Sequence, residues 1–302
     1  MYENLTRLDL VGPALARALG DPGWERLEAT LVSGGKSNLT FELASDAGEA
    51  VLRRPPDGPL LPRAHDMGRE ARIQRALAGT VVPVAKILFE DAVDLLHHIE
   101  RHAIDPEAVG LTGYGRPSGL GERQVRRWSD QWERSKSRDI PAVDGLGRLL
   151  RANPPTGPGG AIVHGDFRID NCILGKHMPP EVKAVLDWEL STLGEPLADL
   201  GLFMFYWREP SDARPAMTPA PTMQTGFPTR AYLAERYAKR TGADLSGLSS
   251  WVALAHFKSA SIAQGIAARV RAGSMAGQDF GNIEGEVERI AAEGLALLTR
   301  GS

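Results

Sequence analysis

Two aspartates and one asparagine stand at the ends of two short apolar runs in the middle of the sequence. The run AIVHGD ends at Asp166, Asn171 follows five residues later, and EVKAVLD ends at Asp187. This Asp-to-Asn spacing is typical of a kinase catalytic loop, in which the aspartate accepts the substrate hydroxyl proton and the asparagine binds a metal ion. A second aspartate at the end of a nearby strand completes the metal site. The pattern therefore predicts phosphoryl transfer with Asp166 as the catalytic base.

The residue types suit this chemistry. Mg²⁺ prefers oxygen ligands, which Asn171 and Asp187 would supply while leaving room for phosphate oxygens and water. Because phosphoryl transfer needs little covalent work from the protein, positioning and charge neutralisation supply most of the rate gain. Arg168, two residues after the predicted base, is a candidate for part of that neutralisation. An isolated HGD could simply be a tight turn, but the order and spacing of all the groups favour a kinase site.

A glycine turn, SGGKSN, joins two alternating segments upstream. Its glycines would let backbone amides approach phosphates closely, and its lysine and serine add donors. Such a turn is by itself more often a simple hairpin, and its place ahead of the acidic residues favours the phosphate interpretation. The predicted nucleotide-binding residues of this turn are Ser33, Gly34, Gly35, Lys36, Ser37 and Asn38.

A second phosphate-side feature is the strand AVLRRPP, which carries Arg53, followed by the helical segment GREARI, which carries Glu70. In protein kinases a strand lysine contacts the α- and β-phosphates and pairs with a glutamate of the next helix. We predict that Arg53 and Glu70 form the corresponding pair, although arginine brings a bidentate fork that lysine lacks. Arg54 should face the opposite side of the strand.

The elements that would position these residues fall into two regions. A short helix is predicted at 13–21, and alternating strands with glycine turns at 28–56 lead into a helix at 67–79. Beyond residue 92 helical patterns dominate, interrupted by two short strands at 161–166 and 181–187 with a loop between them. The sequence therefore predicts an α+β fold. The later helices are expected at 92–102, 122–135, 144–153, 198–207, 231–240, 250–270 and 285–298.

Composition narrows the class of protein. The 302 residues are 42% hydrophobic and 24% charged, as in a globular chain of one large or two modest domains. A formal charge of −3 argues against nucleic acid or an anionic membrane as the main partner. The single cysteine, Cys172, is expected to be a small buried side chain and favours the reducing cytoplasm. No secretory leader and no apolar run of about 20 residues is present, so we expect a soluble, unprocessed protein.

The segments HGDFRIDN, VLDWELSTLGEPLADLG and VLRRPP resemble the aminoglycoside phosphotransferase-like superfamily, and most closely the kinase-like domain of acyl-CoA dehydrogenase family members ten and eleven. The likeness covers residues 33–90 and 105–298. It implies a bilobal protein-kinase-like fold, with a small antiparallel-sheet N-lobe at 1–91 and a larger, mostly helical C-lobe at 92–302. It also implies ATP or GTP as co-substrate, Mg²⁺, and a small-molecule hydroxyl acceptor held by the helical lobe.

The resemblance also assigns roles to residues. Asp166 is the base, Asn171 and Asp187 are the metal ligands, and Arg53 with Glu70 forms the phosphate-side pair. In a further assignment, Asp199 of PLADLG corresponds to the helix residue that steadies the catalytic loop in this superfamily.

One departure from the family concerns the hinge. Family members carry a hinge hairpin, commonly reading like YVMEYVDG, and an interlobe linker, whereas FED at 89–91 here runs almost straight into AVDLLHHIERH. Either the protein lacks the segment that cradles the adenine, or the printed sequence lacks a stretch of it. The exposed sheet edge that the first alternative would leave favours the second.

Rival motifs fit less well. The residues GKS at 35–37 match the end of a P-loop motif. That motif needs a glycine at position 30, which is Thr30, and a helix after Ser37, where the alternating pattern predicts a strand. The histidines His97, His98 and His102 suggest zinc, but HHIERH lacks the glutamate of HExxH and is more typical of a helix face.

Aromatic and basic residues near the start of the helical region have simpler interpretations. Trp128 and Trp132 are spaced for one helix face and are predicted to pack. The neighbouring arginines predict a solvated helix face, or a basic rim that attracts a phosphorylated or CoA-linked acceptor. They are Arg123, Arg126, Arg127 and Arg134.

The leading hypothesis is an active kinase for a small hydroxylated molecule. A hydroxyacyl-CoA or hydroxy acid is favoured over an aminoglycoside, because the resemblance points there and the C-lobe lacks the acidic cluster that a polycation would favour. The alternative is a pseudokinase-like module that binds a nucleotide or ligand without turnover. The three residues Asp166, Asn171 and Asp187 argue against that alternative, whereas Arg53 and the missing hinge leave it open.

Overall fold

The structure of the chain is a computed structural model. It describes residues 6, 8–32, 39–54, 67–78, 80, 102, 104–174, 182–224, 227–271 and 281–299. The chain forms two compact units: the first comprises Met1–Thr112 and Asp170–Ser191, and the second comprises Gly113–Ile169 and Thr192–Ser302. Three predictions fall outside the described residues. They are the boundary at residues 91 and 92, the loss of a hinge near that boundary, and most of the helix at 92–102.

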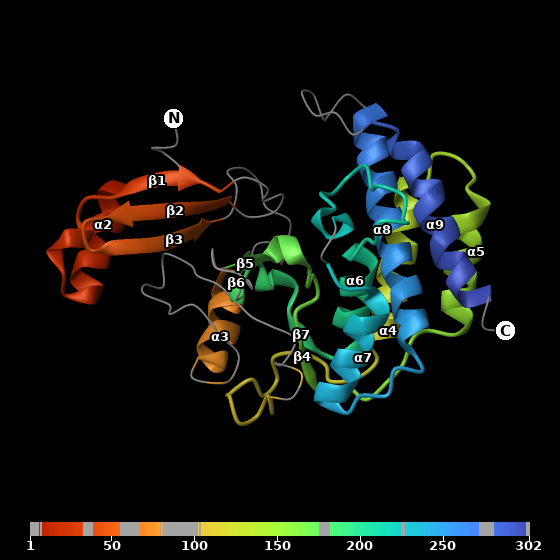
Figure 1. The fold of residues 1–302 in the computed structure, drawn as a ribbon, viewed down its shortest axis with the longest axis horizontal. Helices are drawn as coiled ribbons and strands as arrows, with labels where there is room; N and C mark the ends of the chain where they lie inside the picture. The colour runs from red at the N-terminus through yellow and green to blue at the C-terminus, as the bar shows by residue number, and fades with distance from the viewer. Residues whose placement is uncertain are drawn as a thin grey trace. The chain divides into compact units, whose positions relative to one another are not determined.

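A three-stranded antiparallel sheet forms the start of the first unit (Figure 1). Its strands are β1 (Glu28–Leu31), β2 (Leu39–Ser45) and β3 (Gly48–Arg54), in that order. The β2–β3 turn is closed where Ser45 pairs with Gly48 and the Ser45 hydroxyl accepts from the amide of Ala47 at 3.2 Å. The three strands confirm the prediction made from the alternating pattern.

The apolar face of this sheet is covered by α2 (Leu8–Leu19) and a 3-10 turn at Pro22–Trp24. Phe41 and Leu43, alternate residues of β2, are fully buried against this cover. The predicted N-terminal helix is thus confirmed. It encloses a small core of its own, which fixes the strand that carries Arg53.

The rest of the first unit combines α3 (Met67–Leu77) with an antiparallel hairpin of β5 (Cys172–Leu174) and β6 (Val182–Val185). A 3-10 turn at Trp188–Leu190 follows the hairpin and packs against α3. The prediction of a loop over 167–180 is wrong at β5. Three residues are too few to show a strand period, and pairing with β6 is what makes them a strand.

Six helices of the described residues dominate the second unit, at the positions that the sequence predicts (Figure 1). The long helix α8 contacts α4, α5, α6 and α9 and is buried along most of its length. A short antiparallel pair of β4 (Ala161–Val163) and β7 (Thr192–Gly194) precedes the loop that carries Asp166, and β7 was not predicted. The helices are α4 (Leu120–Ser135), α5 (Pro141–Ala152), α6 (Leu197–Tyr206), α7 (Arg230–Thr241), α8 (Leu248–Arg271) and α9 (Ile283–Thr299).

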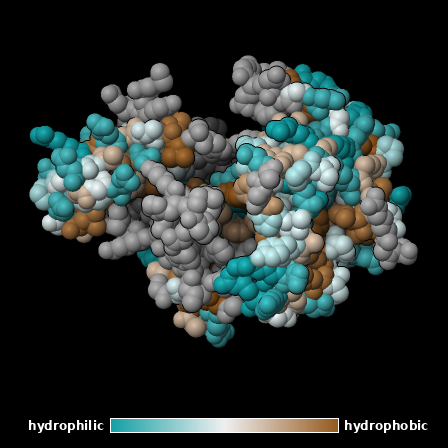
Figure 2. Space-filling model, in the orientation of Figure 1, coloured by the Kyte–Doolittle hydropathy of each residue, from teal (hydrophilic) through white to brown (hydrophobic). Residues whose placement is uncertain are grey.

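The surface and core of the second unit follow the polarity of its helices. Hydrophilic residues gather over the region of α7 in Figure 2, in keeping with a helix in which Tyr237 is the buried residue. Trp132 of α4 is fully buried and Trp128 nearly so, which confirms the packing role predicted for both. Of the helices that the structure describes, none has the length and apolar character needed to span a bilayer.

Candidate active site

The loop after β4 carries Asp166 and is held by a carboxylate from α6. Asp199 is fully buried, and its two oxygens accept hydrogen bonds from the amides of His164 at 2.7 Å and Gly165 at 2.8 Å. Gly165 has a φ of 84°, a backbone conformation that favours glycine. These bonds confirm the role of Asp199 that the family resemblance implied, because a carboxylate bound to two amides fixes the turn just before Asp166.

The carboxylate of Asp166 lies among positive charges. Lys258 of α8 places its Nζ 3.1 Å from Asp166 Oδ1 and 3.2 Å from the carbonyl oxygen of Gly165. Burial raises the pKa of Asp166, but Lys258 and then Arg168 more than offset this, so that the pKa lies below its ordinary value. Asp166 is therefore a carboxylate at neutral pH, as a catalytic base must be.

Arg168 and Tyr206 complete the surroundings of this carboxylate. The guanidinium carbon of Arg168 lies 4.2 Å from the centre of the Tyr206 ring, a cation–π contact. Burial, and next the charge of Asp166, raises the pKa of the Tyr206 phenol. Tyr206 therefore stays neutral beside the carboxylate.

Neither Lys258 nor Tyr206 was predicted as a site residue. A signal was present for Lys258, which interrupts the apolar pattern of a mostly buried helix and is only 12% exposed. Buried lysines are rare unless they are paired, so this position should have suggested an acidic partner. That partner is 92 residues away in the sequence.

In the first unit, the β5–β6 hairpin brings the two predicted metal ligands to one end. Cys172 pairs with Val185, and the amide of Leu186 donates to the backbone carbonyl of Asn171 at 2.5 Å. Asn171 thus directly precedes β5, and Asp187 follows shortly after the end of β6. Antiparallel pairing explains how two residues that are well separated along the chain become neighbours.

Asp187 has an unusual backbone. Its φ of 71° is the one positive φ at a non-glycine residue among those described. Aspartate tolerates this conformation better than most residues, and such backbone strain is common at functional sites.

The donor chemistry of this end of the hairpin fits Mg²⁺. Asn171 and Asp187 offer an amide oxygen and a carboxylate, both hard ligands. Within the described ranges, which include His102 of the three histidines, no group of three or more His, Cys, Asp or Glu side chains could hold a metal. Two such ligands would leave positions on the ion for phosphate oxygens and water.

Arg53 lies in contact with this end of the hairpin. Its side chain is 3% exposed, and Nη2 lies 3.1 Å from Asp187 Oδ1. The predicted partner, Glu70, belongs to α3, but its side chain lies outside the described residues. The whole glycine turn at 33–38 also lies outside them, as does the side chain of Arg54.

The predicted site residues are thus divided between the two units. Asp166 and Arg168 belong to the second unit, whereas Arg53, Asn171 and Asp187 belong to the first. The boundary between Ile169 and Asp170 lies inside the motif HGDFRIDN. The convergence of base and metal ligands on one triphosphate therefore stays a prediction.

The basic and thiol side chains singled out in the sequence have mixed outcomes. Arg126, Arg127 and Arg134 lie at solvated positions of α4, as predicted. Arg123 instead donates to the backbone carbonyls of Ser118 and Arg116. Cys172 is only partly buried, not enclosed as expected, because its strand belongs to a two-stranded hairpin.

A cavity of about 490 Å³ lies elsewhere in the second unit, lined by the end of α6 and by α7, α8 and α9. Met204 and Val252 give it apolar walls, and Arg208 and His256 give it polar ones. His256 is two residues from Lys258 on α8, and residues two apart point to different sides of a helix. The cavity therefore opens on a different side of α8 from Asp166.

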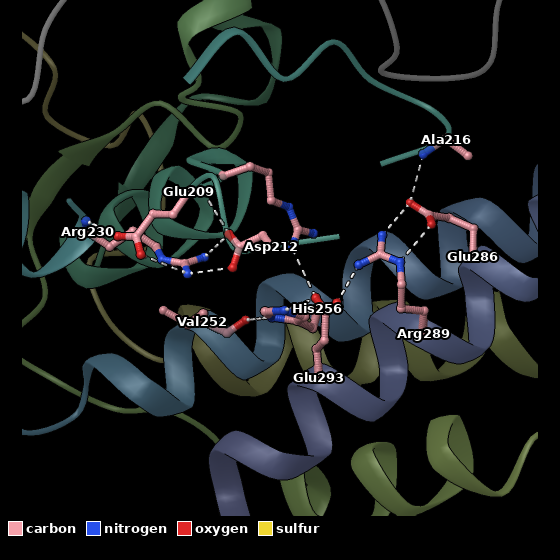
Figure 3. A network of polar contacts seen from close by, with 10 residues as sticks. Glu209, Asp212, Ala216, Arg230, Val252, His256, Glu286, Arg289 and Glu293 are labelled. Carbon is pink, nitrogen blue, oxygen red and sulfur yellow. Dashed lines mark hydrogen bonds and ion pairs between the residues drawn. The ribbon is translucent and has the colours of Figure 1, made fainter. Parts of the chain in front are cut away.

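The polar wall of this cavity is an ion network (Figure 3). The Glu293 carboxylate forms an ion pair with Nη1 of Arg208 at 3.0 Å and another with Arg289. Its Oε2 also lies 3.5 Å from Nε2 of His256. Burial raises the pKa of Glu293, but His256, Arg208 and Arg289 lower it to about 2. Because these charges pair with one another, the network joins α8 and α9 to the segment that follows α6.

Comparisons with known proteins place the chain in a family. The model described as "Phosphotransferase enzyme family" matches residues 28–101 and 89–220. The two matches overlap at 89–101, the stretch in which the sequence analysis predicts a departure from the family. Human acyl-CoA dehydrogenase family member 11 is 33% identical over 329 residues, which cover 92% of this chain and 41% of that protein. The mouse family member 10 is 29% identical, over 94% of this chain and 30% of that protein.

The chain therefore spans about two fifths or less of the length of these relatives. The alignment to the human protein is longer than the 302-residue chain, so the relative has residues without a counterpart here. A crystal structure of a proposed aminoglycoside phosphotransferase from Ralstonia eutropha is 29% identical, with a TM-score of 0.73 over 91% of this chain and 93% of the other. It confirms the expected α+β kinase-like fold. The chain belongs to the phosphotransferase enzyme family.

Proposed function

We propose that this chain is a small-molecule kinase that transfers the γ-phosphoryl group of ATP or GTP to a hydroxyl group. The main observation behind the proposal is that Asp166 is held in place and ionised. It follows a turn fixed by Asp199, and Lys258 and Arg168 keep it ionised. A fixed, ionised carboxylate in the position of the family's catalytic loop is the group that a hydroxyl acceptor needs.

In the proposed step, Asp166 takes the proton of the acceptor hydroxyl. A bond forms between the acceptor oxygen and the γ-phosphorus while the bond from the γ-phosphorus to the β–γ bridging oxygen breaks. The nucleoside diphosphate leaves with that electron pair, and the proton later passes from Asp166 to solvent. Arg168 would offset charge on the transferred group, and Arg53 would bind phosphate oxygens from the nucleotide side.

Asn171 and Asp187 are proposed to hold Mg²⁺ with the nucleotide. When bound, the ion would neutralise phosphate charge. The chain's own contribution is the strained backbone at Asp187 and the hairpin pairing that fixes Asn171 beside it. The glycine turn at Ser33–Asn38 and the Arg53–Glu70 pair are proposed to bind the remaining phosphates.

For the acceptor, a hydroxyacyl-CoA or hydroxy acid is favoured over an aminoglycoside-like compound. Lys258 and Arg168 near the base oppose a polycationic acceptor. The names of the relatives point to acyl-CoA chemistry, and exposed arginines on α4 supply a basic rim. Cytoplasmic location, supported by the single cysteine, is part of the same proposal.

The alternative is a pseudokinase-like module that binds a nucleotide without turnover. The contact that favours it is the ion pair of Arg53 with Asp187, which engages an oxygen of a proposed metal ligand. In an active enzyme the same carboxylate would also have to bind Mg²⁺.

A transfer assay separates these proposals. The protein is incubated with γ-labelled ATP or GTP, Mg²⁺ and a panel of hydroxy acids, hydroxyacyl-CoAs and aminoglycosides. Labelled product is expected with wild type, and Asp166→Asn should lower transfer about 10²- to 10⁴-fold because the base is lost. Asp130→Asn, the same change at an exposed position of α4, should leave the rate unchanged. Nucleotide binding without labelled product from any acceptor would favour the non-catalytic module.

A further inference from the structure

Lys258 occupies a position where a lysine is costly unless it has a partner. It lies on α8, a largely enclosed helix of the second unit, and only 12% of its side chain is exposed. Removing an ammonium group from water without compensation is strongly unfavourable. The side chain must therefore obtain its compensation from the groups that surround its Nζ.

Those groups come from two other elements. Nζ lies 3.1 Å from Asp166 Oδ1 and 3.2 Å from the carbonyl oxygen of Gly165, both in the catalytic loop. It also lies 5.9 Å from the ring centre of Trp128 on α4, within range of a cation–π contact. A carboxylate, a carbonyl oxygen and an aromatic face each attract an ammonium group, so these three groups compensate for its removal from water.

Resting on the proposed function, we propose that Lys258 is a positioning residue for phosphoryl transfer, which clamps the Asp166 carboxylate and the preceding turn to α8 and keeps that carboxylate ionised. The clamp complements Asp199. The latter holds the amides of the turn, whereas Lys258 holds a carbonyl of the turn and the side chain of the base. A side chain of α6 thereby binds the amide donors of this short loop, and a side chain of α8 binds its acceptors.

Removal of the ammonium should change the titration of Asp166. The groups facing this carboxylate are Lys258, Arg168, Tyr206 and His164. Without Lys258, burial is opposed mainly by Arg168, and the pKa of Asp166 should rise. The base is then protonated over a wider range of pH.

The first experiment follows Asp166 itself and needs neither nucleotide nor acceptor. Carboxyl carbons of aspartate are labelled with ¹³C and titrated by NMR, and Asp166→Asn identifies the signal. In Lys258→Met the midpoint should lie about one pH unit or more above wild type, and Lys258→Arg should restore it. Lys239→Met, at an exposed position of α7, is the control and should leave the midpoint unchanged. An unchanged midpoint in Lys258→Met would overturn the inference.

A second variant keeps the test decisive if the apolar one does not fold. Lys258→Gln retains a hydrogen-bond donor but no charge, so it should raise the midpoint as Lys258→Met does. A midpoint in Lys258→Gln equal to that of wild type would overturn the inference in the same way, because it would show that the charge is not what holds the base ionised.

Kinetics with an acceptor found by the transfer assay give a separate readout. In Lys258→Met the acidic limb of the kcat/KM profile should move to higher pH and kcat should fall about tenfold or more, with the KM for nucleotide unchanged. Wild type that transfers no phosphate to any acceptor would defeat the proposed function, while the NMR titration would still decide the role of Lys258. Transfer with an unshifted profile in Lys258→Met would defeat this inference alone.

Discussion

Asp187 carries two constraints in one residue, a left-handed backbone with φ of 71° and an ion pair with the buried Arg53. In this backbone conformation a residue that carries a β-carbon, unless it is Asn or Asp, destabilises the fold by about 1 to 2 kcal/mol. The ion pair requires a carboxylate. Aspartate meets both requirements, so the residue fits its position on physical grounds as well as its proposed role with Mg²⁺.

These constraints predict an inverted order of stability for two variants. Glycine normally destabilises a chain relative to alanine, by about 0.5 to 1 kcal/mol in regular elements. At position 187 both variants lose the ion pair equally, and only alanine retains the backbone penalty. Asp187→Gly should therefore be about 1 kcal/mol more stable than Asp187→Ala in urea unfolding monitored by fluorescence. Equal stability, or a more stable alanine variant, would show that the left-handed backbone is relaxed.

At this scale the sequence provides Asp166, Asn171 and Asp187 as candidates, because their order and spacing along the chain is itself the signal. Asp199 could be predicted through the family resemblance. Lys258 and Tyr206 could not be obtained in the same way, because α8 and α6 bring them to the base from distant parts of the chain. Only a folded structure reveals such a pairing.

Among the elements, helices were predicted well and the shortest strands poorly. Segments such as 250–270 contain several turns of apolar periodicity, so α8 was identified almost to its ends. The strands β5 and β7 have three residues each, which is less than two periods of a strand. Their existence depends on pairing with β6 and β4, a non-local property.

Packing between helices gives a test at the element scale. A β-carbon added to Gly201 of α6 would lie 2.7 Å from the backbone carbonyl carbon of Trp251 on α8. At Gly145 of α5 the nearest atom would be 3.5 Å away, an ordinary contact. Gly201→Ala should cost about 1 to 3 kcal/mol of stability, whereas Gly145→Ala should gain about 0.5 to 1 kcal/mol from helix propensity.

Thermal and urea unfolding of the two variants measure this difference. Because both substitutions replace a helical glycine by alanine, the comparison isolates the close approach of α6 and α8. Stabilisation by both would mean that the two helices lie farther apart than the structure has them.

For the molecule as a whole, the Glu293 network predicts how stability depends on acid. The pKa of Glu293 falls from 4.5 to about 2 in the folded state, so its contribution is fully present above pH 4.5. That contribution should be lost as the pH falls from 4.5 towards 2, because protonation is then easier in the unfolded chain. The free energy of unfolding should decline over this window more steeply in wild type than in Glu293→Gln.

The matched control is Glu288→Gln on the same helix. Its ion pair with Arg138 is largely exposed, so the loss at neutral pH should be at most about 1 kcal/mol. Glu293→Gln should lose about 2 to 3 kcal/mol, because the nearly buried Arg208 loses a charged partner. Urea unfolding between about pH 2 and pH 7 measures both quantities, and parallel curves for wild type and Glu293→Gln would contradict the role of Glu293.

The two units are interleaved along the chain, since the segment Asp170–Ser191 of the first unit is inserted in the sequence of the second. No single cut can therefore separate them. A fragment that begins after Thr112 would lose Arg53 and α3. It would still keep the hairpin with Asn171 and Asp187 at its end. A cut at any other point of the chain would likewise divide at least one of the two units, so two or more cuts are needed to exchange one unit intact.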